Sequence, residues 1–194
     1  MCFCVLLTGC AAASAVVTAS KIANLALEAS GLKKPDLPEL PELQKPPRNV
    51  LLKLHAGVNL NAGNTNKPLS MVIRIYKLKQ TSAFYSAPYE SFLSPEKEKA
   101  VLGADLVEVR EINLVPSQLY EVVEKVSREA AYVGVVVLFL APAPQRWRAA
   151  FAVKDAETSG IILGLHACSI TLGKGALPEQ TGTAVLPVTP ARCQ

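Results

Sequence analysis

The clearest pattern of apolar and polar positions lies in residues 50–78. In residues 50–60 every second residue is apolar, and residues 69–75 alternate in the same way. Such alternation predicts two half-buried β-strands. The Asn-rich run between them favours an exposed loop that closes at Pro68. This loop is either an ordinary surface connection or an interaction loop displayed by a rigid sheet.

Residues 81–104 have a different pattern, which predicts one or two short helices inserted between strands. Ser94 followed by Pro95 is typical of a helix start, with Ser as the N-cap and Pro at the first helical position. A further strand is predicted at 106–114, with a bulge between Val109 and Ile112, where the buried face changes.

Residues 119–126 fit two kinds of element. The spacing of Leu119, Val122, Val123 and Val126 is that of an amphipathic helix. The Val and Tyr content of the same segment favours a strand. Periodicity alone therefore predicts a helix, and composition predicts a strand.

The remaining apolar segments predict more strands. Residues 132–140 form a continuous apolar run, which is typical of a strand within a core. Residues 146–153 and 160–171 are also predicted as strands, joined by a polar turn at 154–159. Several short strands separated by turn residues indicate a mainly β domain, either a sandwich or a barrel.

The N-terminal segment carries a candidate lipidation site. Residues 7–10 read Leu-Thr-Gly-Cys after a short apolar run, which is similar to a bacterial lipobox. We therefore expect residues 1–9 to be a signal remnant and Cys10 to be lipidated. Ala11 directly after Cys10 favours the outer membrane. The alternative is a transmembrane helix, which the small residues of this stretch disfavour.

Two segments of simple composition separate Cys10 from the predicted domain. Residues 10–32 are Ala-rich, with one weak apolar stripe that fits a helix. Residues 33–48 contain five prolines and predict an extended linker without helix or strand, which reaches roughly 50 Å. The folded domain is then expected at 49–194.

The composition of the chain narrows the range of functions. The 194 residues carry a net charge of +4, but the basic residues are scattered among acidic ones, so no nucleic-acid partner is indicated. No Cys-x-x-Cys motif with partner histidines and no nucleotide or hydrolase fingerprint occurs. We expect no catalysis, no cofactor and no metal.

Cys168 and Cys193 are the two cysteines outside the N-terminal segment. An oxidising periplasm would allow a disulfide between them, which would tie down the C-terminal tail. The chain-entropy model gives such a bond roughly 3 kcal/mol of stabilisation. The alternative is a buried free thiol at Cys168, with Cys193 in a frayed tail.

The order of motifs over residues 52–153 resembles the TssJ family, the outer-membrane lipoproteins of type VI secretion systems. The matching positions are residues 59–66 and 68–78, Phe84, Leu93, residues 102–106, Pro116, residues 132–135, Trp147 and Arg148. The resemblance implies a transthyretin-like sandwich of two antiparallel sheets with a small helical insertion. It also implies a strand at 119–125, which we adopt over the periodicity.

The resemblance also implies a function. We expect a non-catalytic scaffold, lipid-anchored at the periplasmic face of the outer membrane and monomeric outside its complex. Its partner would be the periplasmic domain of a TssM-like inner-membrane protein. The alternative is a periplasmic lipoprotein whose sandwich binds a carbohydrate or a peptide.

In the TssJ family the loop between the first two strands protrudes and contacts TssM. The resemblance therefore assigns partner binding to Asn61, Ala62, Gly63, Asn64, Thr65, Asn66 and Lys67. Asn side chains both donate and accept hydrogen bonds, and Gly63 permits a positive φ. We expect Leu60 and Pro68 to tie the loop ends to the sheet, and the loop itself to bury no core residue.

Overall fold

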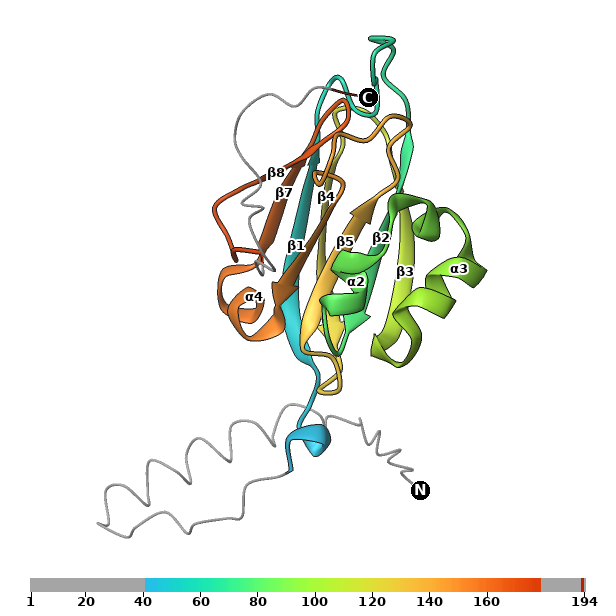
Figure 1. The fold of residues 1–194 in the computed structure, drawn as a ribbon. Coiled ribbons are helices and arrows are strands. Elements are labelled where there is room, and N and C mark those ends of the chain that lie inside the picture. Colours follow the sequence, from blue (N-terminus) through green and yellow to red (C-terminus); the bar gives the residue numbers. More distant parts are fainter. Residues whose placement is uncertain (1–40, 179–192, 194) are drawn as a thin grey trace, which may run out of the picture. The chain divides into compact units, whose positions relative to one another are not determined.

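A computed structural model describes residues 41–178 and Cys193 (Figure 1). The expectations for the lipobox at Cys10, the Ala-rich segment and the first part of the linker lie outside the described residues.

Two four-stranded sheets pack against each other, one with strand order β4-β1-β7-β8 and the other with order β3-β2-β5-β6 (Figure 1). The strands are β1 (Arg48–Ala56), β2 (Met71–Leu78), β3 (Leu106–Leu114), β4 (Leu119–Val126), β5 (Tyr132–Val137), β6 (Arg148–Ala152), β7 (Ile161–Leu165) and β8 (Ile170–Leu172). This arrangement confirms the predicted mainly β, two-sheet class.

The path of the chain between the sheets explains the strand directions. β1 and β2 lie in different sheets, so residues 57–70 cross from one sheet to the other and do not form a hairpin. The chain returns through α4 (Val153–Ser159) to the end where β1 begins. β7 therefore pairs with β1 in parallel, so this sheet is mixed, whereas the resemblance implied a sheet that is antiparallel throughout. The other described pairs are antiparallel, as expected.

The core fills the space between the sheets. Alternate residues of β1, namely Val50, Leu52 and Leu54, are fully buried there. Ile73 and Ile75 of β2 are buried in the same core. The period-2 pattern of the sequence is thus the pattern of burial, because successive side chains of a strand point to opposite faces.

The helical insertion lies between β2 and β3, where residues 81–104 predicted it. It consists of α2 (Ser82–Ser86), η2 (Tyr89–Leu93), α3 (Pro95–Leu102) and η3 (Gly103–Asp105). The Ser94 hydroxyl accepts the N–H of Lys97 at 3.4 Å, which confirms the predicted cap. Among residues 41–178, none of the helices has the length and hydropathy needed to cross a membrane.

Aromatic packing joins the insertion to the second sheet. Tyr76 of β2 contacts Phe84 and Phe92 edge-to-face, with ring centroids 5.6 and 5.9 Å apart. Gly134 of β5 lies under Phe84, where an added Cβ would approach the ring to 3.0 Å. The insertion therefore covers the face of this sheet that points away from the core.

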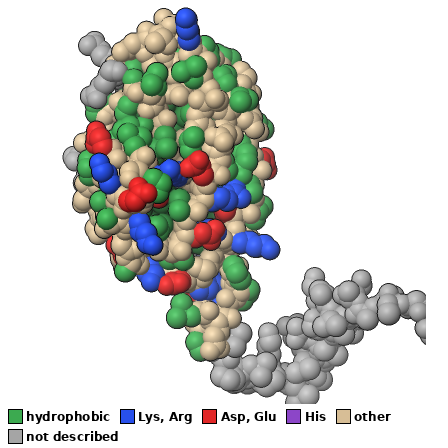
Figure 2. All heavy atoms as spheres, turned by 90° about the vertical axis from the view of Figure 1, so that its right-hand side faces the viewer, with side chains coloured by type: hydrophobic (Ala, Val, Ile, Leu, Met, Phe, Trp, Pro, Cys, Tyr) green, Lys and Arg blue, Asp and Glu red, His purple; other side chains and the backbone are tan. Residues whose placement is uncertain are grey.

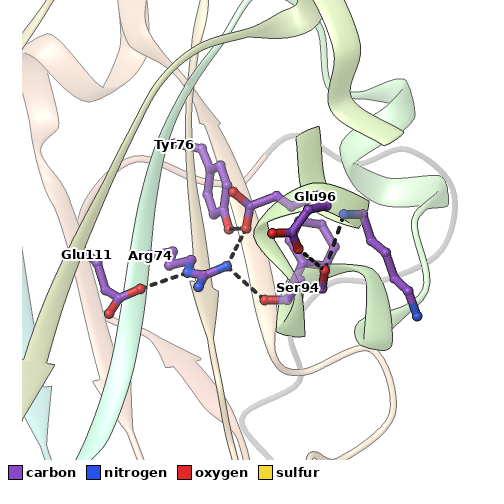
Figure 3. A network of polar contacts seen from close by, with 8 residues as sticks. Arg74, Tyr76, Ser94, Glu96 and Glu111 are labelled. Carbon is purple, nitrogen blue, oxygen red and sulfur yellow. Dashed lines mark hydrogen bonds and ion pairs between the residues drawn. The ribbon is translucent and has the colours of Figure 1, made fainter. Parts of the chain in front are cut away.

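A buried polar network fixes α3 to β2 (Figure 3). Arg74 donates to the Glu98 carboxylate at 2.6 Å and to the Phe92 carbonyl at 2.9 Å. The Tyr76 hydroxyl donates to the same Glu98 oxygen at 2.7 Å. Burial and the neighbouring carboxylate raise the pKa of Tyr76, so this hydroxyl stays protonated and acts as a donor. Glu111 of β3 takes a further N–H of Arg74 at 3.0 Å.

The structure decides three predictions about individual elements. Residues 119–126 form strand β4, as the family resemblance implied and against the helical periodicity. The polar turn predicted at 154–159 is wrong, because α4 occupies this stretch and buries Val153 and Ala156. The single strand predicted at 160–171 is wrong, because β7 and β8 form a hairpin around residues 166–169.

Two predicted boundaries also change. The register shift in β3 lies opposite Lys77 and Leu78, not between Val109 and Ile112 as predicted. The linker was predicted to hold no regular structure, which is wrong for its end, where η1 (Glu42–Gln44) forms and β1 begins at Arg48. The Glu42 carboxylate bonds Arg48 and Arg128 at 2.9 Å each, which holds this end against the sandwich.

Candidate partner-binding loops

Four loops gather at one end of the sandwich, at the top of Figure 1. They are residues 57–70 after β1, 115–118 after β3, 138–147 after β5 and 166–169 after β7. We call these four loops the loop platform. They share one end because β1, β3, β5 and β7 all run toward it.

The turn at 166–169 is the hub of this platform. Its carbonyls at His166, Ala167 and Cys168 accept three amides from other loops. The donors are Asn61 at 3.0 Å, Gly63 at 3.1 Å and Ala143 at 2.8 Å, in that order. The positions of two other loops therefore depend on this one turn.

Asn61 is an internal anchor of its loop. Its Oδ1 accepts the N–H of Leu140 at 2.8 Å, and its Nδ2 donates to the Ser70 carbonyl at 3.3 Å. Its φ of 53° lies in the left-handed region, which Asn tolerates better than most residues. Asn61 is only 6% exposed, so it is not the displayed contact residue that the resemblance assigned.

The expectation that this loop buries no core residue is also wrong. Leu60 and Ala62 are buried together with Asn61. Leu60 does tie the first end of the loop to the core, as expected. The second tie is made by Leu69, whose N–H donates to the Leu60 carbonyl at 3.0 Å, and not by Pro68.

The tip of the loop is an ordered turn with exposed side chains. The Thr65 hydroxyl donates to the Ala62 carbonyl at 2.8 Å and accepts from the Lys67 N–H at 3.3 Å. Gly63 has a φ of 53°, the conformation for which glycine was expected there. Asn64, Thr65, Asn66 and Lys67 are exposed. Among the predicted contact residues, these four are therefore the ones that a partner can reach.

The loop platform also exposes apolar side chains. Leu140 is 65% exposed in the loop after β5, Val58 is exposed in the same loop as the tip, and Val115 is exposed in the loop after β3. The sequence pattern places Val58 and Leu69 on buried strand faces, but β1 ends at Ala56 and β2 begins only at Met71. Both residues therefore lie in the loop, where Leu69 is also exposed. Val58, Leu69 and Leu140 were missed because their signal was that of a strand.

The loop platform contains no acidic residue, and its basic residues are Lys67 and Arg146. Figure 2 shows the same contrast on one side of the molecule. Side chains of both charges gather in the lower part, whereas the upper part is mostly apolar or uncharged, apart from one basic side chain at the tip. The platform therefore suits a surface that is apolar and neutral or acidic.

The structure joins Cys168 to Cys193 by a disulfide, the pair that the sequence suggested, with 5.5 Å between the Cα atoms. Cys168 is 2% exposed and supplies one of the hub carbonyls. The bond therefore attaches the C-terminal part of the chain directly to the loop platform.

Each histidine has a simple environment among the residues that the structure describes. His166 Nε2 lies 2.8 Å from the Thr171 hydroxyl, and burial lowers the pKa of this histidine. His55 is exposed on β1. Within residues 41–178 and at Cys193, no three His, Cys, Asp or Glu side chains come together in a way that could hold a metal ion.

The model of one protein family matches residues 48–168 of the chain. This family is described as the type VI secretion lipoprotein family of VasD, EvfM and TssJ. A comparison with curated proteins found no match.

Several solved structures share the fold. The type VI secretion lipoprotein TssJ1 from Pseudomonas aeruginosa is 27% identical, with a TM-score of 0.59 over 71% of this chain and 100% of that chain. A chain in the structure described as the TssM C-terminal domain from EAEC is 25% identical, with a TM-score of 0.55 over 65% and 98% of the two chains. Serratia marcescens Lip, a membrane-bound component of the type VI secretion system, is 20% identical with a TM-score of 0.53 over 70% and 99%, which shows the fold alone. Because the family model matches more than half of its residues, this chain belongs to the type VI secretion lipoprotein family that includes TssJ.

Proposed function

We propose that this chain is a non-catalytic scaffold of a type VI secretion membrane complex and binds the periplasmic domain of a TssM-like inner-membrane protein through its loop platform. Family membership supports the assignment to a secretion lipoprotein. Similar chains occur in structures described as a type VI membrane complex and as a TssM C-terminal domain. Outside the complex, the chain would be a monomer.

The observation that carries this proposal is the construction of the loop at 57–70. Its tip exposes Asn64, Thr65, Asn66 and Lys67, while Leu60, Asn61 and Ala62 are buried at its base. A loop held in this way loses little conformational entropy when it binds, so more of the contact free energy appears as affinity.

The apolar residues of the loop platform add a second kind of contact. Leu140, Val58 and Val115 expose apolar surface that can be removed from water by a partner. Lys67 adds a positive charge that increases the association rate more than the affinity. The partner surface would therefore combine an apolar region with a neutral or acidic region opposite Lys67.

A substitution confined to the tip tests this proposal in the full chain. The variant Asn64→Ala, Asn66→Gly, Lys67→Ala keeps the Thr65 turn, and Gly is compatible with the φ of 55° at position 66. We expect an unchanged fold and an affinity at least 100-fold lower, about 2.7 kcal/mol, by calorimetry with the purified periplasmic domain of the TssM-like protein. Light scattering of the free chain would check the monomer.

The control for this experiment lies in α4, at the opposite end of the sandwich. Lys154 and Thr158 are exposed there, so Lys154→Ala, Thr158→Ala should leave the affinity unchanged. An unchanged affinity of the tip variant, in a protein that is still folded, would overturn the proposed interface.

Anchoring at the periplasmic face of the outer membrane through an acylated Cys10 is part of the same proposal. Membership in a lipoprotein family and the Leu-Thr-Gly-Cys sequence support it. Multiple acyl chains hold a protein stably at a membrane, whereas a single chain binds only marginally. With a complete lipoprotein signal sequence in front of the chain, Cys10→Ser should move the protein to the soluble periplasmic fraction. Retention of this variant in the outer membrane would contradict the assignment.

A further inference from the structure

We propose that the Cys168–Cys193 disulfide positions the partner-binding loop, residues 57–70. The disulfide holds the hub turn at 166–169, to which the backbone of residues 57–63 is hydrogen-bonded. The bond does not touch the exposed tip. It would act through the turn at 166–169, so Cys168 and Cys193 are positioning residues. The consequence for partner binding rests on the proposed function, but the effect on the loop itself does not.

The hydrogen bonds at the hub run from the partner-binding loop to the turn. Asn61 and Gly63 donate their N–H groups to consecutive carbonyls of the turn, at His166 and Ala167. Gly57 donates to the Leu165 carbonyl at 2.8 Å, directly before the turn. The base of the partner-binding loop thus has three backbone bonds to one strand end and turn, and displacement of this turn would break them.

The disulfide is attached within this same turn. Cys168 is the third hub residue, and its carbonyl accepts the Ala143 N–H at 2.8 Å. Within the turn, the described backbone bond is the one from the His166 N–H to the Ser169 carbonyl at 3.0 Å. Cys168 is 2% exposed and its sulfur is bonded to Cys193, so an outward movement of this residue would have to carry Cys193 with it.

The turn is also connected to the loop at 138–147. Asn61 Oδ1 holds the Leu140 N–H, and the Ile170 N–H donates to the Arg146 carbonyl at 2.8 Å. Opening of the hub turn would therefore release both the loop at 57–63 and the loop at 138–147. Local opening of this kind is a low-energy event in proteins and is measured by amide hydrogen exchange.

Removal of one sulfur tests the proposal in the full chain. In a background in which Cys2, Cys4 and Cys10 are serine, only Cys168 and Cys193 can pair. Cys193→Ser then removes the bond and leaves the buried Cys168 as a thiol. We expect the amides of Asn61, Gly63 and Ala143 to exchange at least tenfold faster, measured residue by residue by NMR.

Amides at the other end of the sandwich are the internal control. Ala131 donates to the Leu78 carbonyl at 2.9 Å, and Val153 donates to the Ala131 carbonyl at 2.8 Å. Their exchange should be unchanged. Equal exchange of the three hub amides with and without the bond would overturn the proposal, because the disulfide would then hold only the C-terminal tail.

Chemical reduction gives the same test without a substitution. A water-soluble phosphine takes the oxygen of one water molecule and becomes a phosphine oxide, while the disulfide gains two electrons and two protons and becomes two thiols. The reduced chain should show the same selective increase in exchange. If reduction leaves the hub amides protected, the proposal is wrong, whatever the folding yield of Cys193→Ser.

Calorimetry with the periplasmic domain of the TssM-like protein measures the effect on binding. We expect Cys193→Ser to bind at least fivefold more weakly, since the partner must then order the loop. Leu102→Ala in α3 is the control, because it destabilises the protein at a buried site outside the loop platform. Its affinity should be unchanged, and an equal loss in both variants would reduce the role of the bond to general stability.

The two proposals can fail separately. If the unmodified chain does not bind the TssM-like domain, the proposed function is wrong, while hydrogen exchange still decides whether the disulfide positions the loop. If binding occurs and exchange is unaffected by loss of the bond, only the positioning role is wrong.

Discussion

Asn61 Oδ1 accepts the backbone N–H of Leu140 at 2.8 Å, and this one bond joins the loop after β1 to the loop after β5. The two residues lie 79 positions apart in the chain. Asn61 is buried and Leu140 is exposed, so the bond holds an exposed apolar side chain at a fixed distance from the tip of the first loop. The displayed surface of the platform is thus fixed by a residue that no partner can reach.

Asn61→Ala is predicted to destabilise the protein by about 3 kcal/mol. Loss of the amide leaves the Leu140 N–H and the Ser70 carbonyl without this partner, which costs about 1–3 kcal/mol. Ala at a φ of 53° adds roughly 1 kcal/mol of backbone strain. Urea unfolding of Asn61→Ala and of the exposed control Asn64→Ala would measure the difference. Equal stability of the two variants would contradict the anchor role.

Leu140→Ser is predicted to weaken partner binding without loss of stability. The side chain of Leu140 is 65% exposed, and the hydrogen bond to Asn61 uses its backbone N–H, so the fold does not depend on this side chain. Removal of an apolar contact from the interface should lower the affinity about tenfold, or about 1.4 kcal/mol. Leu177→Ser, at an exposed apolar residue outside the platform, is the matched control. The same affinity for both variants would place Leu140 outside the interface.

The fold was largely predictable because its strongest signals are local. The alternation in β1 and the Ser94–Pro95 pair depend on neighbouring residues only, and both predictions are correct. β4 lacked such a signal. Its inward face includes Glu124, a buried carboxylate that pairs with Arg110 of the other sheet at 2.7 Å. Leu119 and Val123, which suggested a helix, are exposed on its outer face.

The site was only partly predictable, because its anchors depend on contacts that are distant in sequence. The polar run around Asn61 correctly indicated an exposed tip, but the burial of Asn61 depends on Leu140 and on the turn at His166. The one local signal was an Asn at a position that requires a positive φ. The burial of Val153 and Ala156 in α4 is likewise tertiary, since α4 packs on β1, and the polar residues between them resemble a turn.

Glu98→Ala is predicted to destabilise the domain by about 3 kcal/mol. Glu98 is 5% exposed and takes hydrogen bonds from Arg74 and Tyr76, so its removal leaves a largely buried cation and a buried hydroxyl without this acceptor. Glu111→Ala removes a half-exposed partner of the same Arg74 and should cost less than about 1 kcal/mol. Chemical denaturation of both variants would compare them. Equal losses would show that burial of Glu98 does not decide its contribution.

Arg148→Lys is predicted to destabilise the helical insertion by about 2 kcal/mol. The guanidinium donates to the carbonyls of Phe84, Tyr85 and Ala87, and its Cζ lies 4.3 Å from the centroid of the Trp147 ring. Burial lowers the pKa of Arg148 to about 10, so the side chain remains charged at neutral pH. A lysine keeps the charge but cannot reach three carbonyls with a planar fork. Thermal unfolding of wild type, Arg148→Lys and Arg148→Met would separate fork geometry from charge. An unchanged midpoint in the Lys variant would show that charge alone is sufficient.

Stability is predicted to fall as the pH decreases below about 6.5, because of His166. Burial lowers the pKa of His166 below its usual value of 6.5, so the unfolded chain takes up this proton at a higher pH than the folded protein does. Protonation then favours the unfolded state from about pH 6.5 downward. The free energy of unfolding stops falling once His166 of the folded protein is also protonated. A single group contributes at most about 1.4 kcal/mol per pH unit.

His166→Gln removes the titration and retains a group that can bond the Thr171 hydroxyl. The free energy of unfolding of this variant should therefore change less between about pH 7.5 and 5.5. His55 is present in both proteins and cancels in the comparison. Urea unfolding across this range gives the two slopes, and identical slopes would show that His166 does not cause the acid sensitivity of the fold.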